Sequence, residues 1–445
     1  MGAARPAREA LTLKWKNCAV FVAVAAVYGA CPVKGPGDLF WSLPTVASIL
    51  REGNAGLDEY APAFHHYPGA IEQVGGRPRN FFPIGSTLVA LAPIWLFDKA
   101  VSLVAPISGV NARLAKGVGN WKREFHRTGE IDPSFFFTTE LVLASLLMAL
   151  AALFIQLAAA ELLPWKWALC VTAVFAFGSP VFSTASRDLG QHGPSVLMIS
   201  VALWLLVRAR REPGGVRWAG LFVAASYLMR PTNSLAVVAI SAFVFFRYRR
   251  WFAAYCACAA AVLVPFFLYN FSVYSALLPT YYRPDRIIPA SAALFLEAAA
   301  GNLVSPARGL LVFSPVFLLS GWGLALAFAR VRLEAGLVAA LLVAHWLVVS
   351  SFPHWWAGHS YGPRYMTDLT PWLCLLLVPV LLRLRETKRW PLGVALALLF
   401  AWSGFTHLRG ATSWAAVGWN ATPRDVDANP DRLWDFADPP FLRGG

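Results

Sequence analysis

The stretch SSFPHWWAGHSYGPRYMTDLTPW, residues 350–372, lies between two long apolar segments. Each flanking segment is predicted to form a helix, at 335–352 and 370–384. The stretch between them brings tryptophan, histidine, arginine and aspartate together with glycine and proline. Irregular backbone at membrane depth is tolerated only where it is buried in protein or lines a cavity. The stretch therefore predicts two membrane helices joined by a polar segment that lines a cavity.

The same alternation recurs along the whole chain of 445 residues. Hydrophobic residues make up 58% and charged residues 14%, against roughly 25% charged residues in a soluble domain. Apolar runs of about 17–25 residues have the length that a helix needs to cross the hydrocarbon core. The sequence thus predicts an all-α fold, a polytopic transmembrane bundle of about 11–13 helices. We expect apolar helices at 17–33, 84–104, 134–160, 167–183, 193–207, 218–229, 234–246, 251–270, 310–328, 335–352, 370–384 and 390–405.

The net charge of +14 comes from short basic clusters between the apolar runs. No nucleic-acid-binding motif accompanies them, and lysine and arginine are typical of cytoplasmic loops. We therefore expect no nucleic acid partner and place the clusters at 5–16, 208–217, 247–250, 330–332 and 383–389 in the cytoplasm. The outward segments are then 33–83, 184–192, 230–233, 271–309, 353–369 and the tail after 406.

This orientation leaves one conflict, because successive loops should alternate between the cytoplasmic and the outward side, and this alternation of sides fails between residues 84 and 134. Either 84–104 does not cross fully or the basic loop 105–133 is misplaced, and the sequence leaves both open.

We divide the chain into a transmembrane domain, 1–406, whose first extracytoplasmic loop is 33–83, and a polar tail, 407–445. Helical periodicity at 39–53 predicts an amphipathic helix along the membrane interface.

Acidic residues in the first outward loop are the first candidates for chemistry. Asp38 follows the first apolar helix, where a carboxylate can act as a general base or hold a divalent cation. The ordinary alternative is a cap of the amphipathic helix that follows. Asp58 and Glu59 form a second acidic pair, which can share a metal in a loop or remain solvated.

Basic residues at the other outward boundaries suggest an anion site. Arg187 and His192 interrupt an apolar run, and ionisable groups there are costly unless paired or facing a wet cavity. Arg230 lies between two short helices, where it either extends to the surface or points at an anion. Arg283 and Arg308 lie in the outward segment 271–309, against the positive-inside trend. Guanidinium groups beside tyrosines suit a phosphate-bearing lipid, whereas the plain alternative is a charged soluble loop.

The quoted stretch itself carries the strongest cluster. Arg364 suits a phosphate, with His359 as a donor. A salt bridge from Arg364 to Asp368, four residues on, is the structural alternative. Four aromatic residues would line the site, although tryptophan is also common at membrane interfaces: Trp355, Trp356, Tyr361 and Tyr365.

Other mechanisms lack their sequence signatures. There is no G-x-x-x-x-G-K-[ST] run, no nucleophile elbow and no zinc-ligand spacing. Any energy must therefore come with the substrate or with an ion gradient.

Several short motifs, taken in order, resemble bacterial integral-membrane glycosyltransferases of the GT-C superfamily, similar to dolichyl-phosphate-mannose-protein mannosyltransferases. The motifs are GDLFWSLPTVASILREGN (37–54), FSTASRDLGQHGPS (182–195), LMRPTNS (228–234), SPARGLLVFSPV (305–316), WWAGHSYGPRY (355–365) and RLWDFADPPFL (432–442).

The resemblance implies a polyprenyl-phosphate-sugar donor, a glycan, lipid or protein acceptor, and an active site on the extracytoplasmic side of the inner (plasma) membrane. An aspartate of the first loop would activate the acceptor hydroxyl or position a metal. Asp38 matches that position, but the family often has an acidic pair there, whereas Leu39 follows Asp38. Mg²⁺ or Mn²⁺ would be the only cofactor, with unknown ligands. The alternatives are a transporter or flippase of a lipid-linked sugar, or a non-catalytic subunit of envelope assembly.

Overall fold

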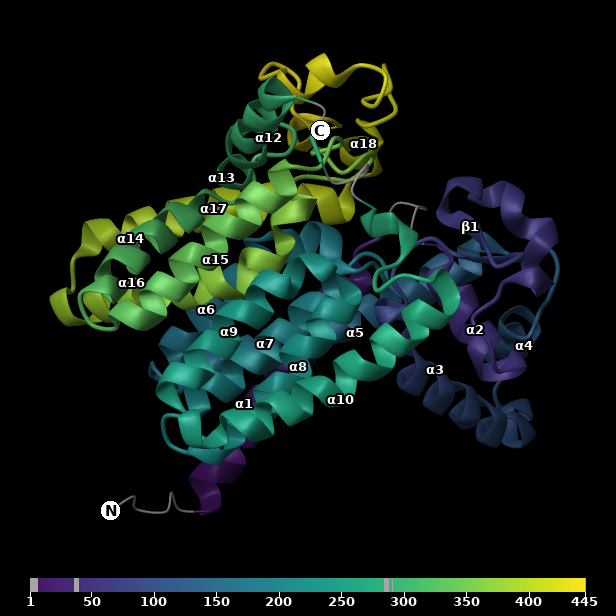
Figure 1. Ribbon diagram of the computed structural model, residues 1–445, viewed down its shortest axis with the longest axis horizontal. Helices are drawn as coiled ribbons and strands as arrows, with labels where there is room; N and C mark the ends of the chain where they lie inside the picture. The colour runs from purple at the N-terminus through teal and green to yellow at the C-terminus, as the bar shows by residue number, and fades with distance from the viewer. Residues whose placement is uncertain (1–6, 36–39, 284–287, 290, 445) are drawn as a thin grey trace.

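The computed structural model describes residues 7–35, 40–283, 288–289 and 291–444. Its regular structure is almost entirely helical (Figure 1). The strands among the described residues are β1 (Ile71–Val74) and β2 (Arg77–Asn80), which form one antiparallel hairpin in the first loop. The all-α prediction is thus confirmed for the described residues.

Every predicted apolar segment contains a helix. The prediction at 310–328 is wrong as one continuous helix, because Ser314 and Pro315 divide it and proline cannot continue a helix. The helices are α1 (Ala7–Ala30), α2 (Ser42–Glu52), α3 (Gly85–Val104), α4 (Ala112–Phe125), α5 (Pro133–Ala160), α6 (Trp165–Phe177), α7 (His192–Arg208), α8 (Val216–Met229), α9 (Ser234–Arg247), α10 (Arg249–Tyr274), α12 (Ala292–Val304), α13 (Leu310–Phe313), α14 (Leu318–Phe328), α15 (Arg332–Ser350), α16 (Thr370–Thr387), α17 (Trp390–Thr412) and α18 (Trp414–Gly418).

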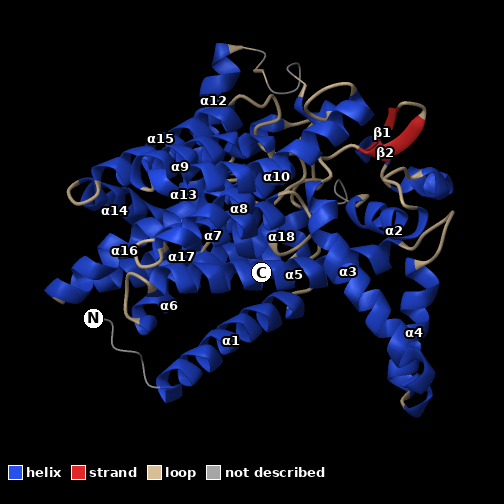
Figure 2. Cartoon of the chain, turned by 60° about the horizontal axis from the view of Figure 1, so that its bottom comes forward, coloured by secondary structure: helices blue, strands red, loops and turns tan. Residues whose placement is uncertain are grey.

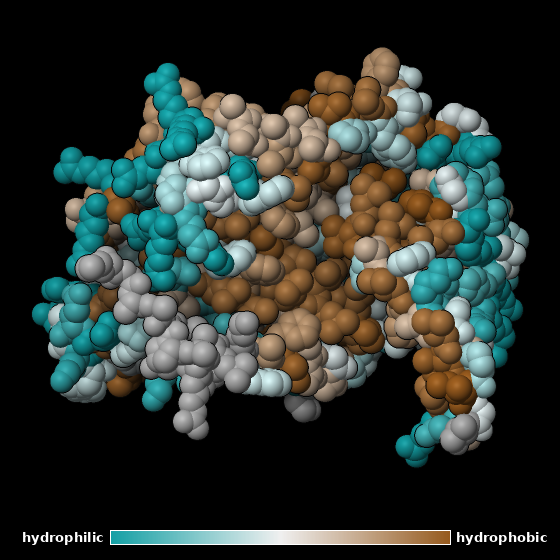
Figure 3. Space-filling model, turned by 90° about the horizontal axis from the view of Figure 1, so that it is seen from below, coloured by the Kyte–Doolittle hydropathy of each residue, from teal (hydrophilic) through white to brown (hydrophobic). Residues whose placement is uncertain are grey.

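Six described helices are long and apolar enough to cross a membrane by length and composition. They are α3, α5, α10 and α15 to α17, and α16 is counted with the short helical turn before it. Figure 3 shows hydrophobic side chains across the middle of one face and hydrophilic side chains toward its two ends. This pattern is consistent with a membrane helical protein.

Hydrogen bonds define the two ends of the bundle. Near the end of α1, the Tyr28 hydroxyl donates to the Ala176 carbonyl at the end of α6, at 2.7 Å. At the opposite end, the Trp165 indole at the start of α6 donates to Asn17 in α1, at 3.2 Å. Residues of the predicted basic clusters 208–217, 247–250 and 330–332 together line one groove. These three clusters therefore share one end of the bundle.

Helix α3 lies in the region between residues 84 and 134, where the predicted alternation of sides fails. Gly85, the first residue of α3, packs against the α8 backbone, where an added Cβ would lie 2.5 Å from the Leu228 carbonyl oxygen. From there α3 leaves the bundle toward α4 (Figures 1 and 2), and only 17% of its most apolar window is buried. Helix α3 thus stands apart from most of the bundle, yet it is long and apolar enough to cross a membrane, so both explanations left open by the sequence stay open.

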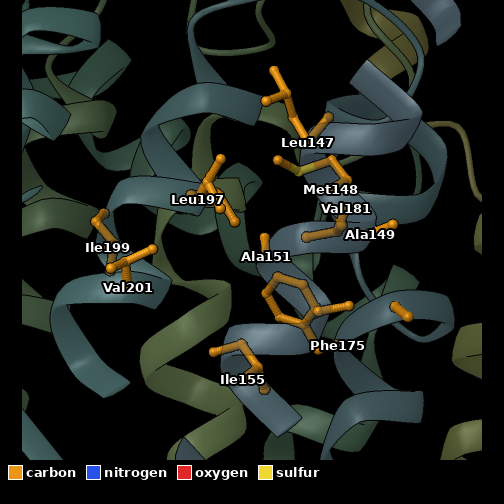
Figure 4. Close-up of a cluster of buried hydrophobic side chains, with 14 of the residues drawn as sticks. Leu147, Met148, Ala149, Ala151, Ile155, Phe175, Val181, Leu197, Ile199 and Val201 are labelled. Atoms are coloured by element: carbon orange, nitrogen blue, oxygen red, sulfur yellow. The ribbon is translucent and has the colours of Figure 1, made fainter. Parts of the chain in front are cut away.

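Small residues hold the bundle together. Figure 4 shows part of the core, where α5 packs against α6 and α7. Alanines of α5 such as Ala151 and Ala152 are completely buried, and small side chains let helix backbones approach closely in a membrane, where hydrophobic burial between helices contributes little. The labelled side chains are Leu147, Met148, Ala149, Ala151, Ile155, Phe175, Val181, Leu197, Ile199 and Val201.

Two parts of the chain before α5 differ from the prediction. Within the predicted segment 39–53, Ser42–Glu52 form helix α2, but residues 42–48 are all buried, so this part of α2 has no free polar face for a membrane interface. Its hydroxyl groups are satisfied internally, since Thr45 donates to the Trp41 carbonyl and Ser48 to the Gly56 carbonyl. Helix α4 is amphipathic and polar, so the search for apolar runs missed it.

The tail is packed rather than separate. Helix α17 continues to Thr412, so the predicted boundary at 406/407 falls inside a helix. Beyond it, Trp419, Val426 and Leu433 form a small buried cluster with Trp355 and Trp356. The tail therefore covers the segment 353–363.

Candidate functional site

The candidate site lies where α7, α8, α9 and α16 meet. His192 and Ser195 both face it, because they are three residues apart on the first turn of α7 and so share one face of the helix. The chain enters α7 through a π-helical turn, Val181–Ala185. Gly193 has to be glycine, since a Cβ there would lie 2.9 Å from the Ala185 carbonyl oxygen.

Arg230 reaches the same place from the end of α8. Its backbone is extended, with φ −141° and ψ 105°, as expected for a residue that precedes a proline. Pro231 then starts a short turn that leads into α9, and Asn233 closes that turn. The sequence Arg-Pro-Thr-Asn thus points Arg230 and Asn233 at α7.

Asp368 joins these residues from the helical turn before α16. Its carboxylate accepts from Arg230 Nη1 at 2.5 Å and lies 2.9 Å from His192 Nδ1, and it also accepts from the Ser195 hydroxyl. The Asn233 amide donates to the Ser195 hydroxyl oxygen at 2.7 Å. We call these five residues the Asp368 cluster. All five are buried.

The histidine in the cluster has two competing partners. Arg230 Nη1 lies 2.6 Å from His192 Nδ1, which itself faces Asp368. Nδ1 can donate to the carboxylate or accept from the guanidinium, but not both. The tautomer of His192 therefore decides whether its Nδ1 binds Asp368 or Arg230.

Aromatic side chains surround the cluster. The Arg230 guanidinium stands 5.8 Å from the ring centre of Tyr365, and the imidazole of His192 is 6.5 Å from the same ring. The Tyr282 hydroxyl donates to Gln191 at 3.3 Å, and burial raises the pKa of Tyr282 above its ordinary range, so this phenol stays protonated. His345 lies 3.1 Å from the backbone carbonyl of Tyr365.

The electrostatics of the region favour an anion. Arg230 and Arg364 are both buried, as is the carboxylate of Asp368, which pairs with Arg230. Among the described residues, Arg230 Nε is buried with no hydrogen-bond partner. Such a donor is costly to bury alone, and a phosphate oxygen would satisfy it.

The structure places Arg308 in a different region. Its guanidinium donates to the carbonyls of Trp356 and Gly358 at 2.7 and 3.1 Å and to the Asn420 side chain at 2.6 Å. It also lies over the Trp419 ring. Burial lowers the pKa of Arg308 to about 9, so it stays charged at neutral pH. Arg308 thus ties the segment 353–363 to the tail.

The other predicted residues of that segment lie in the same layer. Trp355 and Trp356 are buried against the tail, and Tyr361 donates to the Thr406 carbonyl at 2.6 Å. His359 pairs with Asp425 at 2.9 Å near the surface. Among the residues predicted at 355–365, Tyr365 has its ring beside Arg230 and His192 of the Asp368 cluster. Arg364 begins the helical turn that carries Asp368.

Arg187 and Arg283 are also apart from the cluster. Arg187 donates to the carbonyls of Tyr28 and Cys31 at 2.7 and 3.3 Å. It therefore binds carbonyls at the C-terminus of α1, where a cation is favourable. Arg283 is exposed in the segment after α10.

The predicted acidic residues divide into two groups. Asp38 lies outside the described residues. Asp58 is exposed and Glu59 half-buried at the start of a short helical turn in the first loop. Within the described residues, no hydrogen bond or ion pair joins either of them to the Asp368 cluster.

Two groups offer several possible metal ligands on the described part of the chain. One is His359 with Asp425 and Asp427, and the other is His65 with His66 and Glu130. In the first group, the two carboxylates already pair with the imidazole, at 2.9 and 3.7 Å. A mixed set of nitrogen and oxygen ligands suits Mn²⁺ better than Mg²⁺, which prefers oxygen. Both groups are largely exposed.

Several cluster members were not predicted as site residues. Asp368 was considered only as a partner of Arg364, yet its described ion pairs are with Arg230 and His192. Ser195 and Asn233 were missed altogether, as was His345, which contacts the Tyr365 carbonyl beside the cluster. The usable signal was spacing, since His192 and Ser195 are three residues apart, as are Arg230 and Asn233.

No known family model matches the sequence, and no curated protein matches it. The resemblance to GT-C glycosyltransferases therefore rests on the short motifs alone. A function for this chain depends on its own residues and their geometry.

Proposed function

We propose that this protein is a membrane glycosyltransferase that moves a sugar from a polyprenyl-phosphate donor to an acceptor hydroxyl outside the cytoplasm. One observation carries the proposal. The Asp368 cluster, in which Arg230 pairs with Asp368, is buried at one end of a bundle of apolar helices, and the buried Arg364 and the ring of Tyr365 extend it into a site with two arginines. Such a site suits a ligand that combines a phosphate, a sugar and a long apolar tail.

The arrangement of charge supports the proposed side of the membrane. Arginines of three basic clusters line a groove formed by the far ends of α7, α9 and α14, whereas Arg230 lies where α8 ends and α9 begins. Under the positive-inside rule the groove faces the cytoplasm. The Asp368 cluster then faces outward across the plasma membrane, where a sugar carried on a lipid can meet a glycan, lipid or protein acceptor.

The proposed step is a substitution at the anomeric carbon of the sugar. The acceptor oxygen forms a bond to that carbon, and the bond between the carbon and the phosphate oxygen breaks. The phosphate leaves with the electron pair, and the hydroxyl proton passes to a carboxylate of the first loop, either Asp38 or the Asp58–Glu59 pair. Arg230 and Arg364 would stabilise the charge that develops on the phosphate, which preorganised donors in a dry site do well.

Whether the transfer reaction requires a divalent cation is a question for experiment. If activity requires Mg²⁺ or Mn²⁺, the first-loop carboxylates or the described histidine–carboxylate groups would have to hold it. Loss of activity on chelation, with recovery by one of the two metals, would decide between a metal-assisted and a metal-free step.

The test is sugar transfer by the purified protein in lipid vesicles, with a panel of polyprenyl-phosphate sugars. We expect Asp38→Asn to bind the donor without turnover and Arg364→Ala to lose donor affinity. Asp435→Asn, an exposed carboxylate of the tail, is the matched control and should behave as wild type. If Asp58→Asn is inactive and Asp38→Asn active, the base lies in the acidic pair.

Two results would refute the proposal. Consumption of no donor on the panel, with donor still bound through Arg364, would instead favour a transporter or flippase of the lipid-linked sugar. No binding at all, with a correctly folded protein, would favour a structural subunit of an envelope assembly.

A further inference from the structure

A large groove lies at the opposite end of the bundle from the Asp368 cluster. Its volume is about 1020 Å³, at the upper limit of the roughly 300–1,000 Å³ typical of small-molecule sites. Helices α7, α9, α14, α15 and α16 form its walls, which are mostly aliphatic and aromatic. Representative wall residues are Leu206, Ile240, Phe243, Val338, Leu375 and Val378.

Guanidinium groups gather where these helices end. Five arginines line the groove, against one carboxylate, Glu334. Within the described part of the chain, none of the five has an ion pair. All five are exposed, so their charge faces the mouth of the groove. They are Arg210, Arg247, Arg249, Arg250 and Arg330.

Aromatic side chains hold part of this charge in place. Trp251 lines the groove, and its ring lies 5.7 Å from the guanidinium groups of both Arg217 and Arg250. Among the described residues, Arg217 Nε is buried without a hydrogen-bond partner. Arg249 lies 5.6 Å from the ring of Phe245. The mouth therefore presents cations beside apolar rings, which suits a phosphate on a hydrocarbon body.

We infer that the groove is a binding site for an anionic diacyl phospholipid of the surrounding bilayer. Its acyl chains would lie along the apolar walls, and its phosphate would lie among the arginines at the mouth. Basic pockets between transmembrane helices on the cytoplasmic side are where anionic lipid headgroups bind. Positive-inside topology explains the sign of the charge, but it does not require a groove of this size under it.

This inference is independent of the glycosyltransferase proposal, because the groove and the Asp368 cluster share no residue. The experiment is native mass spectrometry of the full chain with added phosphatidylglycerol, phosphatidylcholine or a polyprenyl phosphate. We expect phosphatidylglycerol to bind roughly tenfold or more tightly than phosphatidylcholine, since each arginine near a membrane surface favours an anionic lipid.

Matched variants separate the groove from general surface charge. The triple variant Arg247→Ala/Arg249→Ala/Arg250→Ala should lose the preference for phosphatidylglycerol. The control Arg383→Ala/Arg385→Ala/Arg389→Ala removes the same charge from exposed residues that do not line the groove, and it should keep the preference. Equal loss in both variants, or equal binding of the two phospholipids by the wild type, would overturn the inference.

A second pair of variants tests the apolar walls without changing charge. Ala239→Phe fills the groove and should weaken phosphatidylglycerol binding several-fold. Val238→Phe adds the same ring at a position that is 67% exposed on the outside of the bundle, and should leave binding unchanged. Tighter binding of the polyprenyl phosphate than of phosphatidylglycerol would overturn the commitment to a diacyl lipid.

Discussion

Replacing Asp368 by asparagine should destabilise the protein by about 3–5 kcal/mol, because it leaves the Arg230 guanidinium buried without its counter-charge. The side chains of Arg230 and Asp368 are 4% and 1% exposed, and their atoms approach to 2.5 Å. Water therefore cannot take the place of the lost carboxylate. Asparagine has the same shape and still offers an oxygen to Ser195, but its amide NH2 group then faces Arg230, so the change removes both the charge and the acceptor of the guanidinium.

The magnitude follows from the geometry. Two unit charges about 4 Å apart interact with about 4 kcal/mol at an effective dielectric constant near 20. Replacing both partners at once should cost much less, since exchanging a whole buried ion pair for neutral groups is often close to neutral. The double variant Asp368→Asn/Arg230→Gln is therefore expected to recover most of the lost stability.

The assay is reversible unfolding in mixed micelles, with the four members of a double-mutant cycle measured together. Glu212→Gln is the control, because it breaks the ion pair between Arg208 and Glu212 on an exposed helix end. This control should leave the free energy of unfolding unchanged within error. The reasoning is refuted if Asp368→Asn is as stable as the control, or if the effects of the two cluster variants simply add.

Three further predictions concern other parts of the molecule. Gly323→Ala should destabilise the protein by at least about 1–3 kcal/mol, because a Cβ there would lie 1.7 Å from a carbonyl oxygen of α16, whereas Gly321→Ala meets no atom within 4 Å and should be tolerated in thermal unfolding. A hydrogen bond from Arg123 holds the pKa of Glu124 below its ordinary value, so its contribution to stability is complete above the unfolded pKa and is lost as the pH falls through the folded pKa. Hydrogen exchange of the α4 amides, relative to exchange in the rest of segment 105–133, should accelerate in that acidic window. If the ratio of the two exchange rates does not change with pH, the prediction is wrong. Arg308→Ala should speed limited proteolysis within 419–433, and Arg308→Lys should not restore protection, because an ammonium cannot reproduce the planar fork.

Hydropathy alone located most helices of this fold. An apolar run such as 134–160 has one physical solution in a bilayer, and the structure has a helix at 133–160. Helix α4 escaped because its sequence, ARLAKGVGNWKREF, is half polar and is stabilised by contacts that hydropathy does not register. One such contact is the hydrogen bond from Trp121 to Asp98, at 2.9 Å.

The candidate site was harder to predict, because its members are distant in sequence. Arg230 and Asp368 are 138 residues apart and meet only through the packing of α7, α8 and α16. The local alternative, a pair between Arg364 and Asp368, needs no tertiary contact and was therefore the natural expectation from spacing. Arg308 shows the reverse problem, since an outward arginine suggests a ligand until carbonyl groups 48 and 50 residues away are found around it.

The bonds of Arg308 also bear on how the protein is made. Arg308 holds segment 353–363 and itself donates to Asn420 and lies over the ring of Trp419, while the two tryptophans of the segment pack with Leu433. A ribosome releases these residues more than a hundred positions after Arg308. During that interval the guanidinium and the two tryptophans of the segment have no partner from the tail. Closure of this layer is thus a late event, which can follow only after the tail has been synthesised.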